Sequence, residues 1–182
     1  MNTALSRLNV VFAYTLSVLA TVTFGCFLST YLVFPDVNPN VDYAVGKQIV
    51  KHVRDFTAMR SKNDLGFVKF DISADLEPLF NWNVKQLFLY LAAEYETENN
   101  HLNQVVLWDK IIKRGETAYL DLRNMNSKYY FFDDGAGLKG HKNITLTFSY
   151  NLIPNAGILH RVTSGHTFQF EFPNEYLQSR RH

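Results

Sequence analysis

The chain has 182 residues, a net charge of +1 and 47% hydrophobic residues, with acids and bases interspersed along it. This balance offers no basic patch for nucleic acid, so we expect no nucleic-acid partner. With Cys26 as the single cysteine, no internal disulfide is available, and a folded domain must be stabilised by its own apolar core.

An uncharged, apolar stretch lies near the N-terminus. No charged residue occurs from Leu8 to Pro35. As a helix, residues 10–34 would span about 37 Å, against a hydrocarbon core of roughly 30 Å. The apolar region of a cleaved signal peptide is only about 7–15 residues long. The length therefore favours an uncleaved transmembrane signal-anchor helix over a long cleaved signal or a buried core helix.

The charges on either side of this helix predict its orientation. Arg7 and the terminal amine precede it, and Asp36 is the first charge that follows it. This asymmetry favours a short cytosolic N-terminus, residues 1–9, with the rest of the chain in the lumen. Residues 35–40 contain two prolines and are predicted to be a linker to a single domain, residues 41–182.

Beyond the linker, an alternation of apolar and polar side chains predicts strands. Residues 68–73 and 167–172 alternate strictly, so each segment is expected to bury one face. Residues 41–53 are ambiguous between strand and helix. Together these segments predict seven to nine strands in an all-β fold, a mostly antiparallel β-sandwich. The other strand candidates and turn signals are 105–112, 119–122, 114–116 and 155–157.

The segment from Trp82 to Ala93 is apolar on both faces of its predicted strand. Phe88 and Tyr90 lie on one face, and leucines occupy alternate positions on the other. Such a strand needs cover on both sides, which either other segments of this chain or a second subunit can supply. The candidate partner interface consists of Trp82, Leu87, Leu89 and Leu91.

Three glycines, Gly135, Gly137 and Gly140, have the spacing G-x-G-x-x-G of dinucleotide-binding loops. That loop binds phosphate only where a strand precedes it and a helix follows. Residues 129–132 can form the strand, but residues 143–150 alternate with the period of a second strand. We therefore predict a glycine-rich hairpin loop, with glycine at positions of positive φ, and no nucleotide site.

The chain contains one N-x-Ser/Thr sequon, Asn143-Ile144-Thr145. Asn143 is predicted to share the polar face of its strand with Thr145, so its side chain should be exposed. It is either an ordinary polar strand residue or, on the lumenal side of a membrane, a glycosylation site.

No residue pattern indicates catalysis. The histidines show neither H-x-x-x-H nor H-x-H spacing, and the one cysteine lies in the predicted membrane helix, so a metal site has little support. A G-x-S-x-G elbow is absent, and Ser164-Gly165-His166 is too generic to nominate a nucleophile. The acids Asp71, Asp75 and Glu77 are close in sequence, which sets no carboxylate separation in space. We predict no catalytic residue, metal or cofactor.

Long stretches of the chain resemble a known family. They begin MNTALSRLNVV, DLGFVKFD and YYFFDDGAGLKG and cover residues 1–27, 64–112 and 129–159. These stretches are similar to subunit 3 of the signal peptidase complex of the endoplasmic reticulum, and the resemblance extends over essentially the whole chain.

The resemblance implies a non-catalytic, single-pass type II glycoprotein of the endoplasmic reticulum membrane. Such a subunit holds and stabilises a separate catalytic serine-protease subunit, within a complex with further subunits, while signal peptides are removed from nascent secretory proteins. It also implies that the family's glycan site falls at Asn143, whereas membrane lipid is expected to contact the anchor helix.

Two alternatives belong to other classes. One is a type II membrane hydrolase that acts by itself, which the absence of catalytic spacing disfavours. The other is a lumenal, membrane-anchored carbohydrate- or peptide-binding receptor with a β-sandwich fold, which nothing in the sequence excludes.

Overall fold

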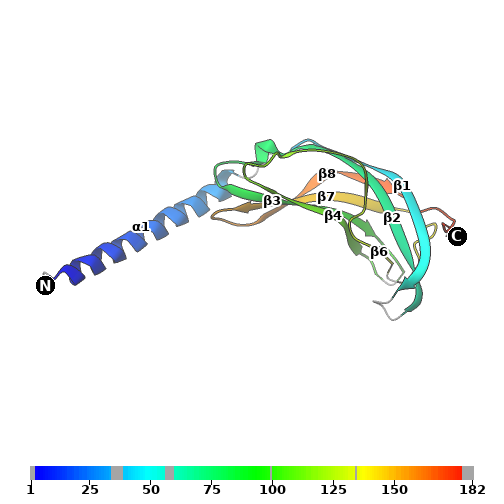
Figure 1. Cartoon of the computed structure of the whole chain (residues 1–182), viewed down its shortest axis with the longest axis horizontal. Coiled ribbons are helices and arrows are strands. Elements are labelled where there is room, and N and C mark those ends of the chain that lie inside the picture. The colour runs from blue at the N-terminus through cyan, green and yellow to red at the C-terminus, as the bar shows by residue number, and fades with distance from the viewer. Residues whose placement is uncertain (1–2, 34–38, 56–59, 99, 134, 178–182) are drawn as a thin grey trace.

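The computed structural model describes residues 3–33, 39–55, 60–98, 100–133 and 135–177. These residues form a long N-terminal helix that leads to eight strands in two sheets (Figure 1). The helices are α1 (Ala4–Val33) and the single-turn 3-10 helix η1 (Glu77–Leu79). The strands are β1 (Val41–Asp55), β2 (Arg60–Asp75), β3 (Val84–Tyr95), β4 (Asn103–Lys113), β5 (Tyr119–Asn126), β6 (Phe131–Phe132), β7 (Ile144–Pro154) and β8 (His160–Phe170).

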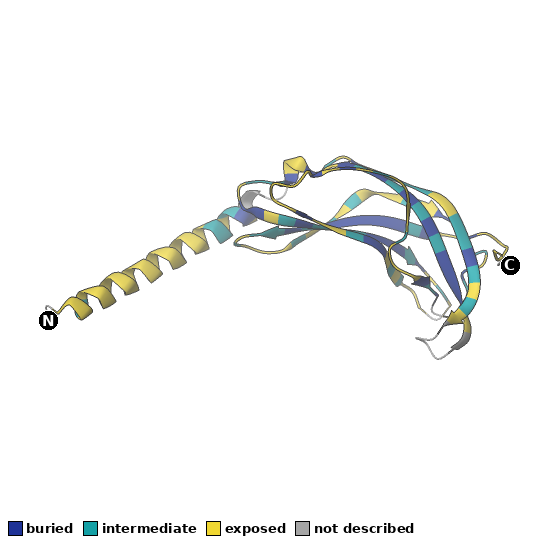
Figure 2. Cartoon of the chain, viewed as in Figure 1, coloured by how far each residue is buried: buried dark blue, intermediate teal, exposed yellow. Residues whose placement is uncertain are grey.

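The strands form two antiparallel sheets that pack face to face. Sheet A has the order β1-β2-β5, with β6 pairing a different part of β2, and sheet B has the order β4-β3-β7-β8. The buried residues line the space between the sheets, while α1 is exposed along most of its length (Figure 2). This architecture confirms the predicted antiparallel β-sandwich behind one N-terminal apolar helix.

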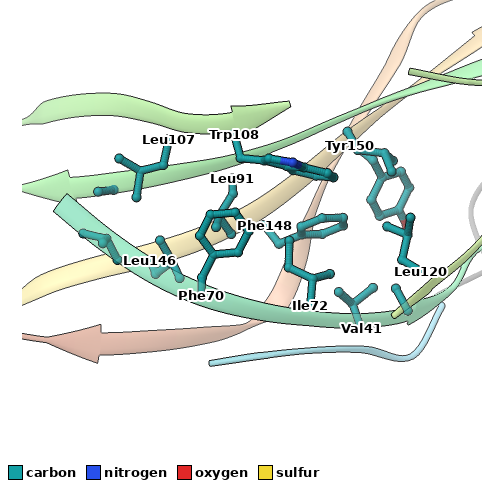
Figure 3. Packing of buried hydrophobic residues seen from close by; sticks show 14 of the residues in the cluster. Val41, Phe70, Ile72, Leu91, Leu107, Trp108, Leu120, Leu146, Phe148 and Tyr150 are labelled. Atoms are coloured by element: carbon teal, nitrogen blue, oxygen red, sulfur yellow. The ribbon is translucent and has the colours of Figure 1, made fainter. Parts of the chain in front are cut away.

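The core consists of the inward-facing side chains of both sheets (Figure 3). Phe70 and Ile72 of β2 lie opposite Phe148 of β7, and all three side chains are fully buried. Trp108 of β4 meets Phe70 edge-on, with 6.2 Å between ring centroids. Each large side chain buried in this way contributes about 1.5–3 kcal/mol relative to exposure, and these residues therefore stabilise a domain that has no disulfide.

Helix α1 begins at Ala4, before the predicted apolar span, because Thr3 provides an N-cap: its Oγ1 accepts a hydrogen bond from the Ser6 amide at 3.3 Å. From Ala4 to Tyr31 the helix is long and apolar enough to cross a membrane. Its hydroxyl groups donate to carbonyls one turn back, which satisfies them without water. These donors are Thr15 to Val11 O, Ser17 to Ala13 O and Thr21 to Ser17 O. The predicted helix end at Phe34 and linker residues 35–38 lie outside the described residues.

Most predicted strands are present, with different ends. The ambiguous segment 41–53 is strand β1, whose register shifts between Val45 and Gln48. β8 begins earlier than predicted, at His160, and ends at Phe170, so Phe172 follows it in the buried core. The turn signal at 114–116 lies between β4 of sheet B and β5 of sheet A, and the one at 155–157 joins the paired strands β7 and β8.

The prediction of a hairpin at the glycine-rich loop is wrong. β6, before the loop, pairs with β2 in sheet A, whereas β7, after it, pairs with β3 and β8 in sheet B. The loop therefore joins two strands, as expected, but carries the chain from one sheet to the other. The aromatic run 129–132 indicated the first strand and alternation indicated the second, whereas the sheet to which each belongs depends on pairing partners that are distant in sequence.

Candidate functional site

The residues weighed for catalysis have structural roles. Over the described ranges, no group of three or more His, Cys, Asp or Glu side chains could hold a metal ion. Ser164 Oγ accepts a hydrogen bond from the backbone amide of His166 within β8, where the register with β7 shifts. The three neighbouring acids accept bonds from backbone amides in the same way. These bonds are Asn124 N to Asp71 (2.6 Å), Glu77 N to Asp75 (3.1 Å) and Ala118 N to Glu77 (2.9 Å).

The amides of the glycine-rich loop are directed at a carboxylate of the chain itself. Gly135 N donates to Asp133 Oδ2 at 2.8 Å, and Gly137 N donates to the same oxygen. Both glycines have positive φ, 112° and 98°, a conformation that glycine adopts without steric cost. The two amides thus bind the Asp133 carboxylate, an anion from within the fold.

A second carboxylate, that of Asp64 in β2, accepts hydrogen bonds from the second half of this loop. Asp64 Oδ2 accepts the amides of Leu138 (3.0 Å) and Lys139 (3.2 Å) and the hydroxyl of Tyr176 (3.3 Å), while Oδ1 contacts His52 Nδ1 at 2.8 Å. Burial by itself raises the pKa of Asp64, but these hydrogen bonds together hold it below the ordinary value of 3.8. The glycine-rich loop is thus hydrogen-bonded within the fold, to Asp133 beside it and to Asp64 of sheet A.

The structure corrects the assignment of β3 faces. Leu87, Leu89 and Leu91 are each 0% exposed and point into the core between the sheets, so they offer no surface to a second subunit. The outward face is the one that carries Phe88 and Tyr90. Alternation showed that both faces are apolar, but which one the opposite sheet covers is a tertiary property.

The outward face of β3 continues onto its neighbours as an apolar patch. Strand register places Ile111 beside Phe88, Val106 beside Ala92, and Ile153 beside Gln86, and directly opposed residues share a face. The Phe88 and Tyr90 rings stack at 5.7 Å, and the Arg161 guanidinium lies 5.7 Å from the Tyr90 ring. We call this surface the outer face of sheet B. It consists of Phe88, Tyr90, Val106, Ile111 and Ile153.

Trp82 lies elsewhere, on the loop that precedes β3, and is 63% exposed. The neighbouring Asn83 binds the β7–β8 turn, because its Nδ2 donates to Ala156 O at 2.6 Å and its carbonyl accepts the Asn155 amide at 2.8 Å. We call the loops 80–83 and 155–159 the helix-proximal rim, because a Cβ added to Gly157 would lie 2.6 Å from Thr30 Oγ1 of α1. The turn therefore packs directly against the end of the helix.

Asn143 lies at the opposite end of the sandwich, directly before β7, and is exposed as predicted. Its φ of 61° is left-handed, a conformation that asparagine adopts more readily than most residues. The 11 residues of β7 span roughly 35 Å at about 3.4 Å per residue, which separates this side chain widely from the helix-proximal rim. An open hollow of ≈ 640 Å³ adjoins it, lined in part by Tyr95 and His141.

These features define the class of protein: a β-sandwich behind one helix that fits membrane anchorage, with an apolar patch on its surface. The chain belongs to the signal peptidase subunit family: a family model described as "Signal peptidase subunit" matches residues 1–175. The chain is 57% identical to signal peptidase complex subunit 3 of Canis lupus familiaris and of Homo sapiens, over 176 residues that cover 97% of this chain and 97% of each relative. It is 56% identical to the same subunit of Drosophila melanogaster, over 98% of this chain and 99% of the relative. The predicted resemblance is thereby confirmed, and the chain is a signal peptidase subunit.

Proposed function

We propose that this chain is a non-catalytic accessory subunit that holds and stabilises the catalytic serine-protease subunit of the signal peptidase complex. In this proposal α1 crosses the endoplasmic reticulum membrane with its N-terminus in the cytosol. The sandwich stands in the lumen, where signal peptides are removed from nascent secretory proteins. The other subunits of the complex are its further partners.

One observation carries this proposal: the similarity to signal peptidase complex subunit 3 covers the helix and both sheets, with 97% of each chain aligned. Family membership over only one part would leave the role of the rest open. Here the same unit of anchor and sandwich is shared from end to end. The structural roles of the described acids, serine and glycine loop agree with a subunit that acts by positioning.

The outer face of sheet B is the surface best suited to the protease partner. It combines stacked aromatic rings, an arginine over one of them and two exposed aliphatic side chains, Val106 and Ile111. Aromatic residues and arginine are enriched in protein interfaces and dominate their binding energy. This face replaces the three buried leucines as the proposed contact.

The proposal is tested by purifying the tagged full-length protein in mild detergent and identifying the proteins that accompany it. We expect a membrane serine protease to co-purify, the preparation to cleave a presecretory substrate, and the chain alone to be inert. A chain that purifies alone, or that cleaves the substrate by itself, would contradict the accessory role.

A variant pair tests the contact surface. Ile111→Asp places a charge on the outer face of sheet B, beside Phe88 on the edge strand β4, at a position 48% exposed and therefore tolerant of a polar side chain in the fold. We expect it to lose most of the co-purifying protease while its circular dichroism and thermal unfolding stay unchanged. Leu102→Asp is the matched control, since Leu102 is 66% exposed at the other end of β4 and should retain the protease. If both variants retain the protease equally, the outer face of sheet B is not the contact.

A further inference from the structure

We propose that the helix-proximal rim is itself a lipid-binding surface, which inserts Trp82, Ile158 and Leu159 into the boundary between headgroups and acyl chains of the bilayer. This inference rests on the proposed membrane anchorage and goes beyond it, because it assigns a second lipid contact to the folded domain. It also assigns Trp82 to lipid, in place of a protein partner.

The first argument concerns height along the helix. Arg7 is the last charge before the apolar stretch, and a charge is costly within the hydrocarbon core. Counting from Leu8, a core of about 30 Å is filled by roughly 20 helical residues and ends near Phe27. Thr30 then lies about 4–5 Å further along, inside a headgroup layer that is roughly 5–7 Å thick. Gly157, packed against Thr30, lies at the same level.

The second argument concerns construction, because the rim is held together as one unit. Asn83 bonds the β7–β8 turn through its side chain and its carbonyl. The side chain of Asn81 accepts the amides of Asn83 (2.9 Å) and Val84 (3.0 Å). Arg114, in the turn that follows β4, donates to the Asn81 and Val84 carbonyls. The position of the turn on α1 therefore fixes the position of the loop that carries Trp82.

The third argument concerns chemistry. Trp82, Ile158 and Leu159 are all exposed large side chains on this one edge, and the two loops contain no acidic residue. The first charges that follow the loops are both basic, Lys85 and Arg161, and both are exposed. Tryptophan is enriched at the membrane–water interface, and aliphatic residues backed by basic ones are typical of segments that lie in that interface. A phospholipid surface satisfies this combination.

The test uses tryptophan fluorescence of the full-length protein in phosphatidylcholine vesicles whose acyl chains carry bromine, a contact quencher, near the headgroup. The chain has two tryptophans, and the other, Trp108, is buried in the core. We expect brominated lipid to quench the wild-type protein, and the Trp82→Phe variant to lose that quenching. The double variant Ile158→Ser, Leu159→Ser should reduce the quenching of Trp82 by withdrawing the rim from the bilayer.

A matched control places the same fluorophore away from the rim: Leu102→Trp in the Trp82→Phe background. This tryptophan lies at the far end of β3 and β4 and should not be quenched. Carbonate extraction and flotation report the anchor separately. A protein that floats with the vesicles while Trp82 is quenched no more than the control would overturn the lipid contact and leave the anchorage intact. A protein that does not float would overturn both. Quenching lost in the purified complex would assign Trp82 to a protein interface and also overturn the inference.

Discussion

Leu89 is a core residue of β3 whose contribution to stability can be measured. Its side chain is 0% exposed and lies beside Tyr150 in the register of β3 and β7. We expect Leu89→Ala to lower the free energy of unfolding by about 2–5 kcal/mol, and Leu89→Asp to prevent folding, since a carboxylate there has no partner. Thermal unfolding of the detergent-purified chain measures this, with Leu102→Asp as the exposed control. A folded Leu89→Asp protein would contradict the assignment of this face to the core.

Asp64 predicts an acid-dependent loss of stability. Its pKa is lowered in the folded state, so its stabilising effect is fully present above the ordinary value of 3.8 and is lost as the pH falls through the lower, folded-state value. Denaturant unfolding between pH 5 and about 2 should therefore show a steeper loss for wild type than for Asp64→Asn, which no longer titrates there. Asp121→Asn, at an exposed ion pair with Arg123, is the control and should follow the wild type. If all three proteins lose stability equally as the pH falls, Asp64 is not the cause of the loss.

At the scale of elements, most of the sandwich could be predicted from the sequence. Alternation of apolar and polar residues located β2 and β8, and a turn signal at its end marked the candidate that became β4. β1 was ambiguous because its register shift, between Val45 and Gln48, interrupts the alternation. The outer face of sheet B was assigned to the wrong side of β3, because the sheet that covers a face comes from segments that meet only in the fold. The hydrogen bonds from the glycine-loop amides to Asp64 were missed for the same reason, since Asp64 is more than 70 residues away in sequence.

Gly157 allows a prediction about the junction between the β7–β8 turn and α1. Its φ of 136° disfavours a side chain, and an added Cβ would meet Thr30 at 2.6 Å. Gly115 also has positive φ, 90°, but nothing lies within 4 Å of an added Cβ. We expect Gly115→Ala to show only the backbone cost, roughly 1 kcal/mol, and Gly157→Ala to be more destabilising. Thermal unfolding compares the two variants, and equal losses would show that the contact with Thr30 contributes nothing.

At the scale of the whole molecule, the sequon reports the orientation of the chain. We predict that Asn143 carries a glycan when the protein is made in endoplasmic reticulum membranes, visible as a mobility shift that endoglycosidase removes. Thr145→Val should abolish the shift while leaving Asn143 and its left-handed backbone in place, and Thr145→Ser should retain it. Because Asn143 is exposed, loss of the glycan should leave thermal stability within about 0.5 kcal/mol. A wild-type protein without any shift would argue against a glycosylated, lumenal sandwich.

The contact between Gly157 and Thr30 also gives the domain a fixed bearing around the helix axis. Each helical residue turns by about 100° and rises about 1.5 Å. One residue inserted into α1 before Thr30 would therefore rotate the contact site of the domain by more than a quarter turn about the helix axis. A seven-residue insertion would nearly restore the rotation angle of the domain and move its contact site by roughly 10 Å along the helix axis. The number of residues in the anchor thus determines two things about the outer face of sheet B: the direction in which it points around the helix axis, and its distance from the bilayer.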